Sequence, residues 1–195
     1  MPDSETHNGR PLIHPETREA WRAWLAANHA TVDGAWVAQW TRASGRTSLD
    51  YELIVEEALC FGWIDGLTHS LGDGRQAFLL TPRRKGSAWS HSNKDRVDRM
   101  VAEGRMTDAG LAVINAAKAD GSWSAKDAAE NLTEPDELAS ALDANPAARR
   151  AWDAFPKSPK RALIYWVTSA KRPETRNRRV QRIVDEAAQG RRATP

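Results

Sequence analysis

Residues 51–81 read YELIVEEALCFGWIDGLTHSLGDGRQAFLLT, and the fold class follows from this stretch. Its first ten residues carry apolar side chains on more than one face of a helix, which predicts a deeply buried helix that ends at Gly62. Two β-compatible runs follow, Trp63 to Ser70 and Arg75 to Thr81, and they flank the glycine-rich turn LGDG. Such runs around a tight turn predict a β-hairpin.

The chain on the amino-terminal side of this stretch adds a helix and a strand. From His14 to His29 the apolar residues recur at three- and four-residue spacing, which is typical of a helix. Residues 34–41 alternate, with the side chains of Trp36, Ala38 and Trp40 on one face, which is typical of a strand. Together with the hairpin, this strand predicts a small antiparallel sheet of about three strands, and helices must cover one face of it.

The chain on the carboxyl-terminal side of Pro82 is predicted to be helical almost throughout. The run Ala162 to Val167 is apolar all round, which places Trp166 in the core. A last helix starts at Pro173 and ends at Gly190. We therefore expect a helix-rich α+β protein, with the sheet in its amino-terminal half and helices alone in its carboxyl-terminal half.

The length of 195 residues suits one domain. We expect a flexible tail over residues 1–13 and a single domain over 14–190, with an α+β part at 14–104 and a helical part at 105–190. Nine Trp against three Phe and two Tyr indicate a core rich in indoles, whose N–H groups need partners when buried.

Localisation and membrane topology are predicted from the same composition. No apolar stretch approaches the roughly 18–20 residues that span a bilayer, so we expect no membrane span. The polar residues 1–10 do not resemble a secretory signal, and the single Cys60 cannot form an internal disulfide. These features predict a cytoplasmic protein.

The sequence lacks the common catalytic and metal-binding motifs, which are HExxH, paired CxxC, GxSxG, GxxxxGK[ST] and GxGxxG. No catalytic residue can be named, we expect no metal and no cofactor, and the sequence leaves open whether the protein is an enzyme. Cys60 lies between Leu59 and Phe61 in the buried helix, where a thiol usually acts as a small hydrophobe.

Polar side chains are concentrated between Glu56 and Asn93. Two arginines follow a predicted strand and precede a glycine, serines and a helix start, which is an arrangement that can hold a carboxylate or a phosphate. With Trp63 or Trp89 as a stacking wall, the hypothesis is a site for a small anionic ligand. Its residues are Glu57, Trp63, Asp65, Arg83, Arg84, Ser87, Trp89, Ser90, Asn93 and, from the last helix, Arg176. The alternative is that Arg83 and Arg84 simply neutralise Glu56, Glu57 or Asp65.

The carboxyl-terminal end is strongly basic. Residues 157–192 carry eleven Lys or Arg and three acids, a net charge of +8, whereas the rest of the chain carries −6. On a helical projection Arg178, Arg179 and Arg182 point away from the apolar stripe, whereas Arg176 lies beside it and should pair with a buried acid or reach a pocket. Because the outward arginines have no interleaved aromatics, we predict a solvated face and do not expect nucleic acid as a partner.

Several motifs together resemble the YdeI/OmpD-associated family, which is also called the bacteriocin-protection family. They are the run from Glu57 to Gly66, Thr81-Pro-Arg-Arg84, Ser87-Ala-Trp-Ser90 with Asn93, the run from Gly104 to Leu111, and the run from Ala170 to Arg179. The resemblance covers residues 16–190 and implies a role in bacterial stress, as tolerance of cationic antimicrobial peptides or bacteriocins. It implies no reaction. The alternatives are an anion-binding protein or enzyme with a site around Asp65, Arg83 and Arg84, and a nucleic-acid-binding protein that uses the basic last helix.

Overall fold

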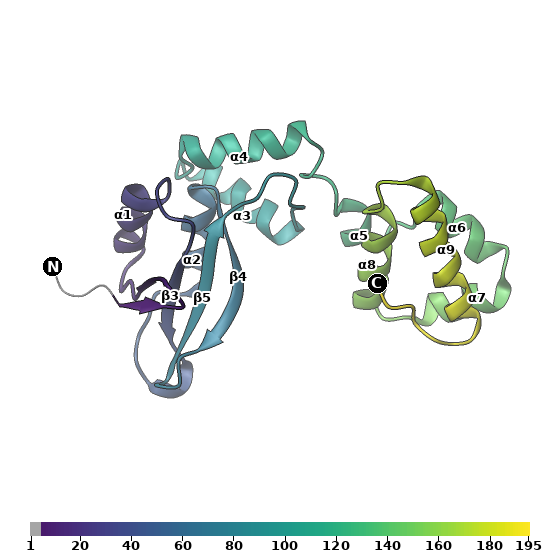
Figure 1. The fold of residues 1–195 in the computed structure, drawn as a ribbon, viewed down its shortest axis with the longest axis horizontal. Coiled ribbons are helices and arrows are strands. Elements are labelled where there is room, and N and C mark those ends of the chain that lie inside the picture. Colours follow the sequence, from purple (N-terminus) through teal and green to yellow (C-terminus); the bar gives the residue numbers. More distant parts are fainter. Residues whose placement is uncertain (1–4) are drawn as a thin grey trace. The chain divides into compact units, whose positions relative to one another are not determined.

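The computed structural model describes residues 5–195, which fall into two compact units (Figure 1). The first unit comprises the chain through Ser87 together with Ser92–Asp120, and the second comprises Ala88–His91 together with Gly121–Pro195. Each unit has its own hydrophobic core. The boundary predicted between residues 104 and 105 falls inside the first unit.

The first unit contains the strands, one 3-10 helix and four of the α-helices that the structure shows within residues 5–195. In chain order its elements are β1 (Thr6–His7), β2 (Arg10–Ile13), α1 (Arg18–Asn28), β3 (Ala35–Trp40), the 3-10 helix η1 (Arg42–Ser44), α2 (Tyr51–Cys60), β4 (Trp63–Ser70), β5 (Arg75–Pro82), α3 (His91–Ala102) and α4 (Asp108–Ala119). The predicted hairpin is confirmed, because β4 pairs antiparallel with β5. The protein is therefore α+β.

The prediction of a three-stranded antiparallel sheet is wrong. Within residues 5–195 the sheet has five strands in the order β1-β2-β3-β5-β4, and it is mixed because β2 runs parallel to β3. The two additional strands are joined by Asn8 and Gly9, with φ of 49° and 74°, in a two-residue turn of the kind that favours hairpins. The flanking strands have two and four residues, which is too short for an alternating pattern to show in the sequence.

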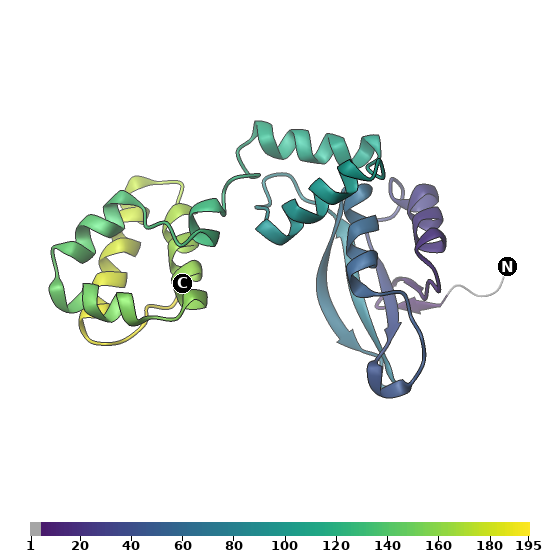
Figure 2. The same ribbon diagram turned by 180° about the vertical axis from the view of Figure 1, so that it is seen from behind.

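One face of the sheet packs against α1 and α2, which supply Trp21, Leu25 and Ile54 to the core of the first unit. Figure 2 views the sheet from the side of α2. Two of the buried indoles have the partners that burial requires: Trp21 Nε1 donates to the Ile54 carbonyl at 3.0 Å, and Trp63 Nε1 donates to the His29 carbonyl at 3.2 Å. The buried Nε1 of Trp36 has no hydrogen-bond partner among the described residues.

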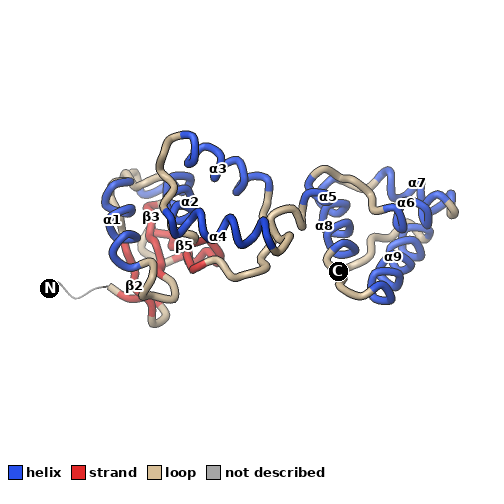
Figure 3. The backbone as a smooth tube through the Cα atoms, turned by 90° about the horizontal axis from the view of Figure 1, so that it is seen from above, coloured by secondary structure: helices blue, strands red, loops and turns tan. Residues whose placement is uncertain are grey.

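The second unit is helical (Figure 3). Its helices are α5 (Asp127–Glu130), α6 (Asp136–Asp143), α7 (Pro146–Ala154), α8 (Lys157–Thr168) and α9 (Pro173–Ala188). The centre of its core includes Trp152, which is fully buried and donates from Nε1 to Glu134 Oε1 at 2.6 Å. None of the helices found in residues 5–195 is long and apolar enough to cross a membrane.

We had expected the run from Ala162 to Val167 to be buried on all sides, but only part of it is buried. Leu163, Ile164 and Val167 are buried, whereas Trp166 is half-buried and packs against the core from its edge. An apolar run gives no single direction for burial, so the packing of α8 against α5 and α9 determines which side faces the core. Part of the Trp166 ring is therefore left for other contacts.

Candidate anion-binding site

Glu57 lies in the core of the first unit, with no exposed side-chain surface. It accepts hydrogen bonds from Arg18 Nε at 2.6 Å, from Arg22 Nη1 at 2.6 Å and from Arg105 Nε at 2.9 Å. Burial raises the pKa of the Glu57 carboxyl, but the three arginines more than offset burial and hold it below its usual range. Glu57 therefore has a structural role in the core. Its ion-pair partners are Arg18, Arg22 and Arg105, and not Arg83 or Arg84.

Cys60 lies one helical turn from Glu57 and is also buried. Burial, together with the charge of Glu57, raises the pKa of its thiol to about 11. A thiol with this pKa stays protonated at neutral pH and is a poor nucleophile.

Trp63 and Asp65 are both committed to contacts inside the first unit. Trp63 is 1% exposed, so it cannot provide a stacking wall for a ligand. Asp65 Oδ2 accepts a hydrogen bond from the Tyr51 hydroxyl at 2.5 Å. Burial lowers the pKa of Arg83 to about 10, although the charge of Asp65 acts in the opposite direction.

The remaining residues of the proposed 83–93 site are divided between the two units. Arg84, Ser87 and Asn93 belong to the first, whereas Trp89 and Ser90 belong to the second. Trp89 is buried and packs against Trp123, with ring centroids 4.9 Å apart. Since the structure describes each unit by itself, a common site for these residues stays a prediction.

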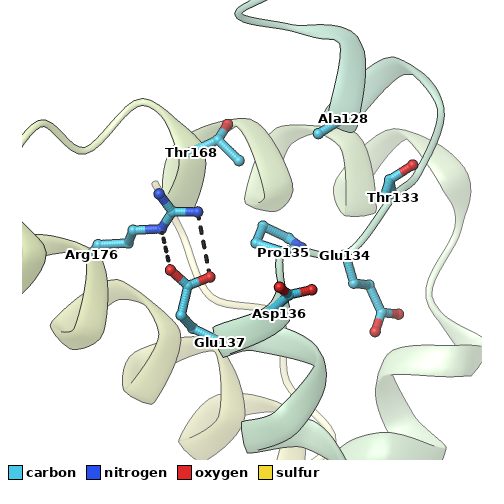
Figure 4. A pocket seen from close by; sticks show the side chains of 8 residues that line it. All are labelled: Ala128, Thr133, Glu134, Pro135, Asp136, Glu137, Thr168 and Arg176. Atoms are coloured by element: carbon cyan, nitrogen blue, oxygen red, sulfur yellow. Dashed lines mark hydrogen bonds and ion pairs between the residues drawn. The ribbon is translucent and has the colours of Figure 1, made fainter.

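Arg176 pairs with an acid and also lines a pocket (Figure 4). Its Nε lies 3.1 Å from Glu137 Oε1, and its Nη2 lies 3.4 Å from Glu137 Oε2. The pocket has a volume of about 600 Å³, and Glu134 at its edge is held by Arg149 and Trp152. The fold therefore already uses the charges of Arg176, Glu137 and Glu134, which leaves few free groups for a ligand.

A second cavity in this unit has a different lining. Its volume is about 210 Å³, and Trp166 of α8 lines it together with Arg178, Arg179 and Arg182 of α9. The guanidinium carbons of Arg179 and Arg182 lie 5.2 Å and 5.8 Å from the centroid of the Trp166 ring. Arg179 Nη1 also donates to the Trp166 carbonyl and, at 3.3 Å, to Ser169 Oγ. We call these four residues the arginine–tryptophan cavity.

No carboxylate lines the arginine–tryptophan cavity, and none of its arginines forms an ion pair with an acid within residues 5–195. The charge of Arg182 does reach Glu186, whose pKa is lowered first by its hydrogen bond with Arg191 and also by that charge. Three like charges in one place repel one another, and contacts with an indole offset only about 0.5–1 kcal/mol each at exposed sites. A bound anion would remove this repulsion.

Comparison with protein families identifies both parts of the chain. Residues 13–113 match the model described as domain of unknown function (DUF8412), and residues 131–190 match the model described as bacteriocin-protection, YdeI or OmpD-associated. The chain belongs to the DUF8412 family. The resemblance to the bacteriocin-protection family is confirmed for residues 131–190. No curated protein and no solved structure matched the chain.

The arginine–tryptophan cavity lies entirely within the bacteriocin-protection domain at residues 131–190. So does the motif at 170–179, whereas the motifs quoted between residues 57 and 111 lie in the part that matches DUF8412.

The sequence alone did not reveal this cavity, because its lining comes from two separate helices. The sequence placed Trp166 in the core and the three arginines on a solvated face without aromatics, but α8 and α9 pack together and bring the indole beside the guanidinium groups. The available signal was the spacing of the three arginines, which places Arg182 one helical turn after both Arg178 and Arg179.

Proposed function

We propose that this protein binds an anionic ligand through the arginine–tryptophan cavity of its bacteriocin-protection domain. The observation that carries the proposal is the lining, which combines three guanidinium groups and one indole with no carboxylate. Arginine suits this role because its planar group stays charged and can donate two parallel hydrogen bonds to one anion. The net charge of +8 over residues 157–192 would also attract an anion from solution.

We expect pyrophosphate to bind the intact protein and the variants Arg178→Gln and Arg182→Gln to bind it about tenfold more weakly. A charge-assisted hydrogen bond contributes about 1.5–3 kcal/mol, and 1.4 kcal/mol corresponds to a factor of ten. Isothermal titration calorimetry measures the affinities at fixed ionic strength.

The matched control is Arg150→Gln, which removes one positive charge from an exposed position on α7, away from the cavity lining. It should change the affinity less than twofold. If it weakens binding as much as Arg182→Gln does, the attraction is a general effect of net charge. If pyrophosphate does not bind at millimolar concentration, the proposal fails.

We further propose that the protein contributes to tolerance of bacteriocins or cationic antimicrobial peptides from the cytoplasm. The family match of residues 131–190 supports this role. A cavity lined by guanidinium groups repels a cationic peptide, so the contribution would come through an anionic ligand rather than by direct capture of the peptide.

A bacterial strain that lacks the gene should survive a cationic peptide less well than its parent. The intact gene and the Arg150→Gln gene should restore survival, whereas the Arg182→Gln gene should restore little of it, because it lacks one of the anion-binding groups. Colony counts after a fixed exposure measure the effect. Equal rescue by all three genes would show that the cavity does not contribute to tolerance. Equal survival of the deleted strain and its parent would refute the role itself.

A further inference from the structure

The arginine–tryptophan cavity also carries information about the kind of anion that fits it. Arg179 is held in place through its bonds to the Trp166 carbonyl and to Ser169 Oγ, whereas Arg178 and Arg182 are exposed and lie one helical turn apart. One guanidinium is thus fixed and two can adjust around a ligand. The volume of about 210 Å³ limits the enclosed part of that ligand to a small group.

The indole is not free to stack with a nucleobase. Trp166 is half-buried against the core of the second unit, and two guanidinium groups, those of Arg179 and Arg182, lie within 6 Å of its ring. A stacked base would have to displace these guanidinium groups and lose both cation–π contacts. The ligand is therefore held by charge and hydrogen bonds, with the indole serving to orient the arginines.

Three guanidinium groups match three acceptor oxygens. A terminal phosphate offers three such oxygens and a charge near −2 at neutral pH, whereas a phosphodiester or a carboxylate offers two free oxygens and one negative charge. We propose that the cavity selects the terminal phosphate of a phosphomonoester on a small molecule. This inference rests on the proposed anion-binding function and specifies its ligand class.

The charge of the ligand provides a test that is separate from the charge of the protein. The second ionisation of a phosphomonoester lies near pH 6, so the ligand loses one negative charge between pH 7.5 and pH 5. Arginines stay protonated throughout this range. Inorganic sulfate is also tetrahedral but keeps two charges at both pH values. A cavity that selects the doubly charged form of the phosphate should lose affinity for the phosphomonoester on acidification and keep its affinity for sulfate.

We would titrate the full chain with O-phosphoserine, inorganic sulfate and a short oligothymidylate without terminal phosphates, at pH 7.5 and pH 5. Phosphoserine should bind at least fivefold more weakly at pH 5, sulfate should change less than twofold, and the oligothymidylate should bind about tenfold more weakly than phosphoserine at pH 7.5. The variant Arg179→Lys keeps the positive charge but loses the planar group that donates two parallel hydrogen bonds. It should weaken phosphoserine binding severalfold, whereas Arg150→Lys should not.

Each contrary result is decisive. Tighter binding of the oligothymidylate would assign the cavity to nucleic acid and overturn the inference. An equal loss of sulfate affinity at pH 5 would show that the protein titrates rather than the ligand, and would also overturn it while leaving the proposed anion binding intact. Vesicles of phosphatidylcholine with phosphatidic acid present the same terminal phosphate on a lipid, and tighter binding to them than to phosphoserine would overturn the assignment to a small molecule.

Discussion

Replacement of Glu57 by alanine is expected to destabilise the first unit by about 3 kcal/mol. Removing one partner from a buried ion-pair group commonly costs about 3–5 kcal/mol, because the remaining charges are left without compensation. The low end applies because the side chains of Arg18, Arg22 and Arg105 are 18%, 31% and 26% exposed, so water can reach part of each guanidinium. Arg18 would keep its contact with Glu56 at 3.1 Å.

Hydrogen exchange of the amides of α2 under native conditions measures this effect, since it reports on the first unit even if the second unfolds separately. Glu52→Ala is the matched control. Glu52 is on the same helix and also pairs with two arginines, Arg96 and Arg99, but it is 44% exposed. A surface ion pair contributes at most about 1 kcal/mol. Equal protection of α2 in the two variants would show that the Glu57 cluster does not stabilise the unit.

Replacement of Gly110 by alanine is expected to destabilise the first unit by about 1–3 kcal/mol, although the same change in an exposed helix stabilises it by about 1 kcal/mol. Gly110 lies in the first turn of α4, where that helix meets the end of α2. A Cβ atom there would lie 2.8 Å from the Cys60 carbonyl carbon and 2.7 Å from Met106 Cε. The backbone cannot retreat easily, because Thr107 bonds to the Cys60 carbonyl through both its amide at 3.2 Å and its hydroxyl at 2.6 Å.

Thermal unfolding together with hydrogen exchange in α4 would measure the change. Ala112→Gly, at an exposed position of the same helix, is the control for helix propensity and should cost about 0.5–1 kcal/mol. A stabilised Gly110→Ala variant would mean that α4 has room to move away from α2. Close packing against α2 would then not explain why the motif from Gly104 to Leu111 has a glycine at position 110.

The sequence predicted well where the signal was local. The helix over residues 51–60 and the β4–β5 hairpin follow from periodicity and from a glycine-rich turn, and both are present. The position of Arg176 beside the apolar stripe of α9 predicted a buried partner acid or a pocket. Arg176 lines a pocket, but the side chain of its partner Glu137 is 46% exposed. The short strands β1 and β2 show no periodicity, and they were missed.

The candidate site could not be predicted in the same way, because its contacts join distant parts of the chain. Glu57 is bound by arginines that lie 39, 35 and 48 residues away. Because Glu57 is acidic, the sequence allowed an ion pair with Arg83 or Arg84. In the structure its partners come instead from α1 and from the loop before α4. Charge alone does not tell which of many arginines reaches a buried acid.

By itself the sequence determined which segments are helices, where the main hairpin turns, and that the carboxyl-terminal end is strongly basic, since these properties depend on neighbours a few residues apart. Only the tertiary structure decided that Trp166 of α8 lies beside Arg179 and Arg182 of α9. The physical reason is that an apolar helix can bury any of its sides, and the choice is made by the free energy of packing the whole unit. That choice turned a basic helix surface into a cavity lined by an indole and three guanidinium groups.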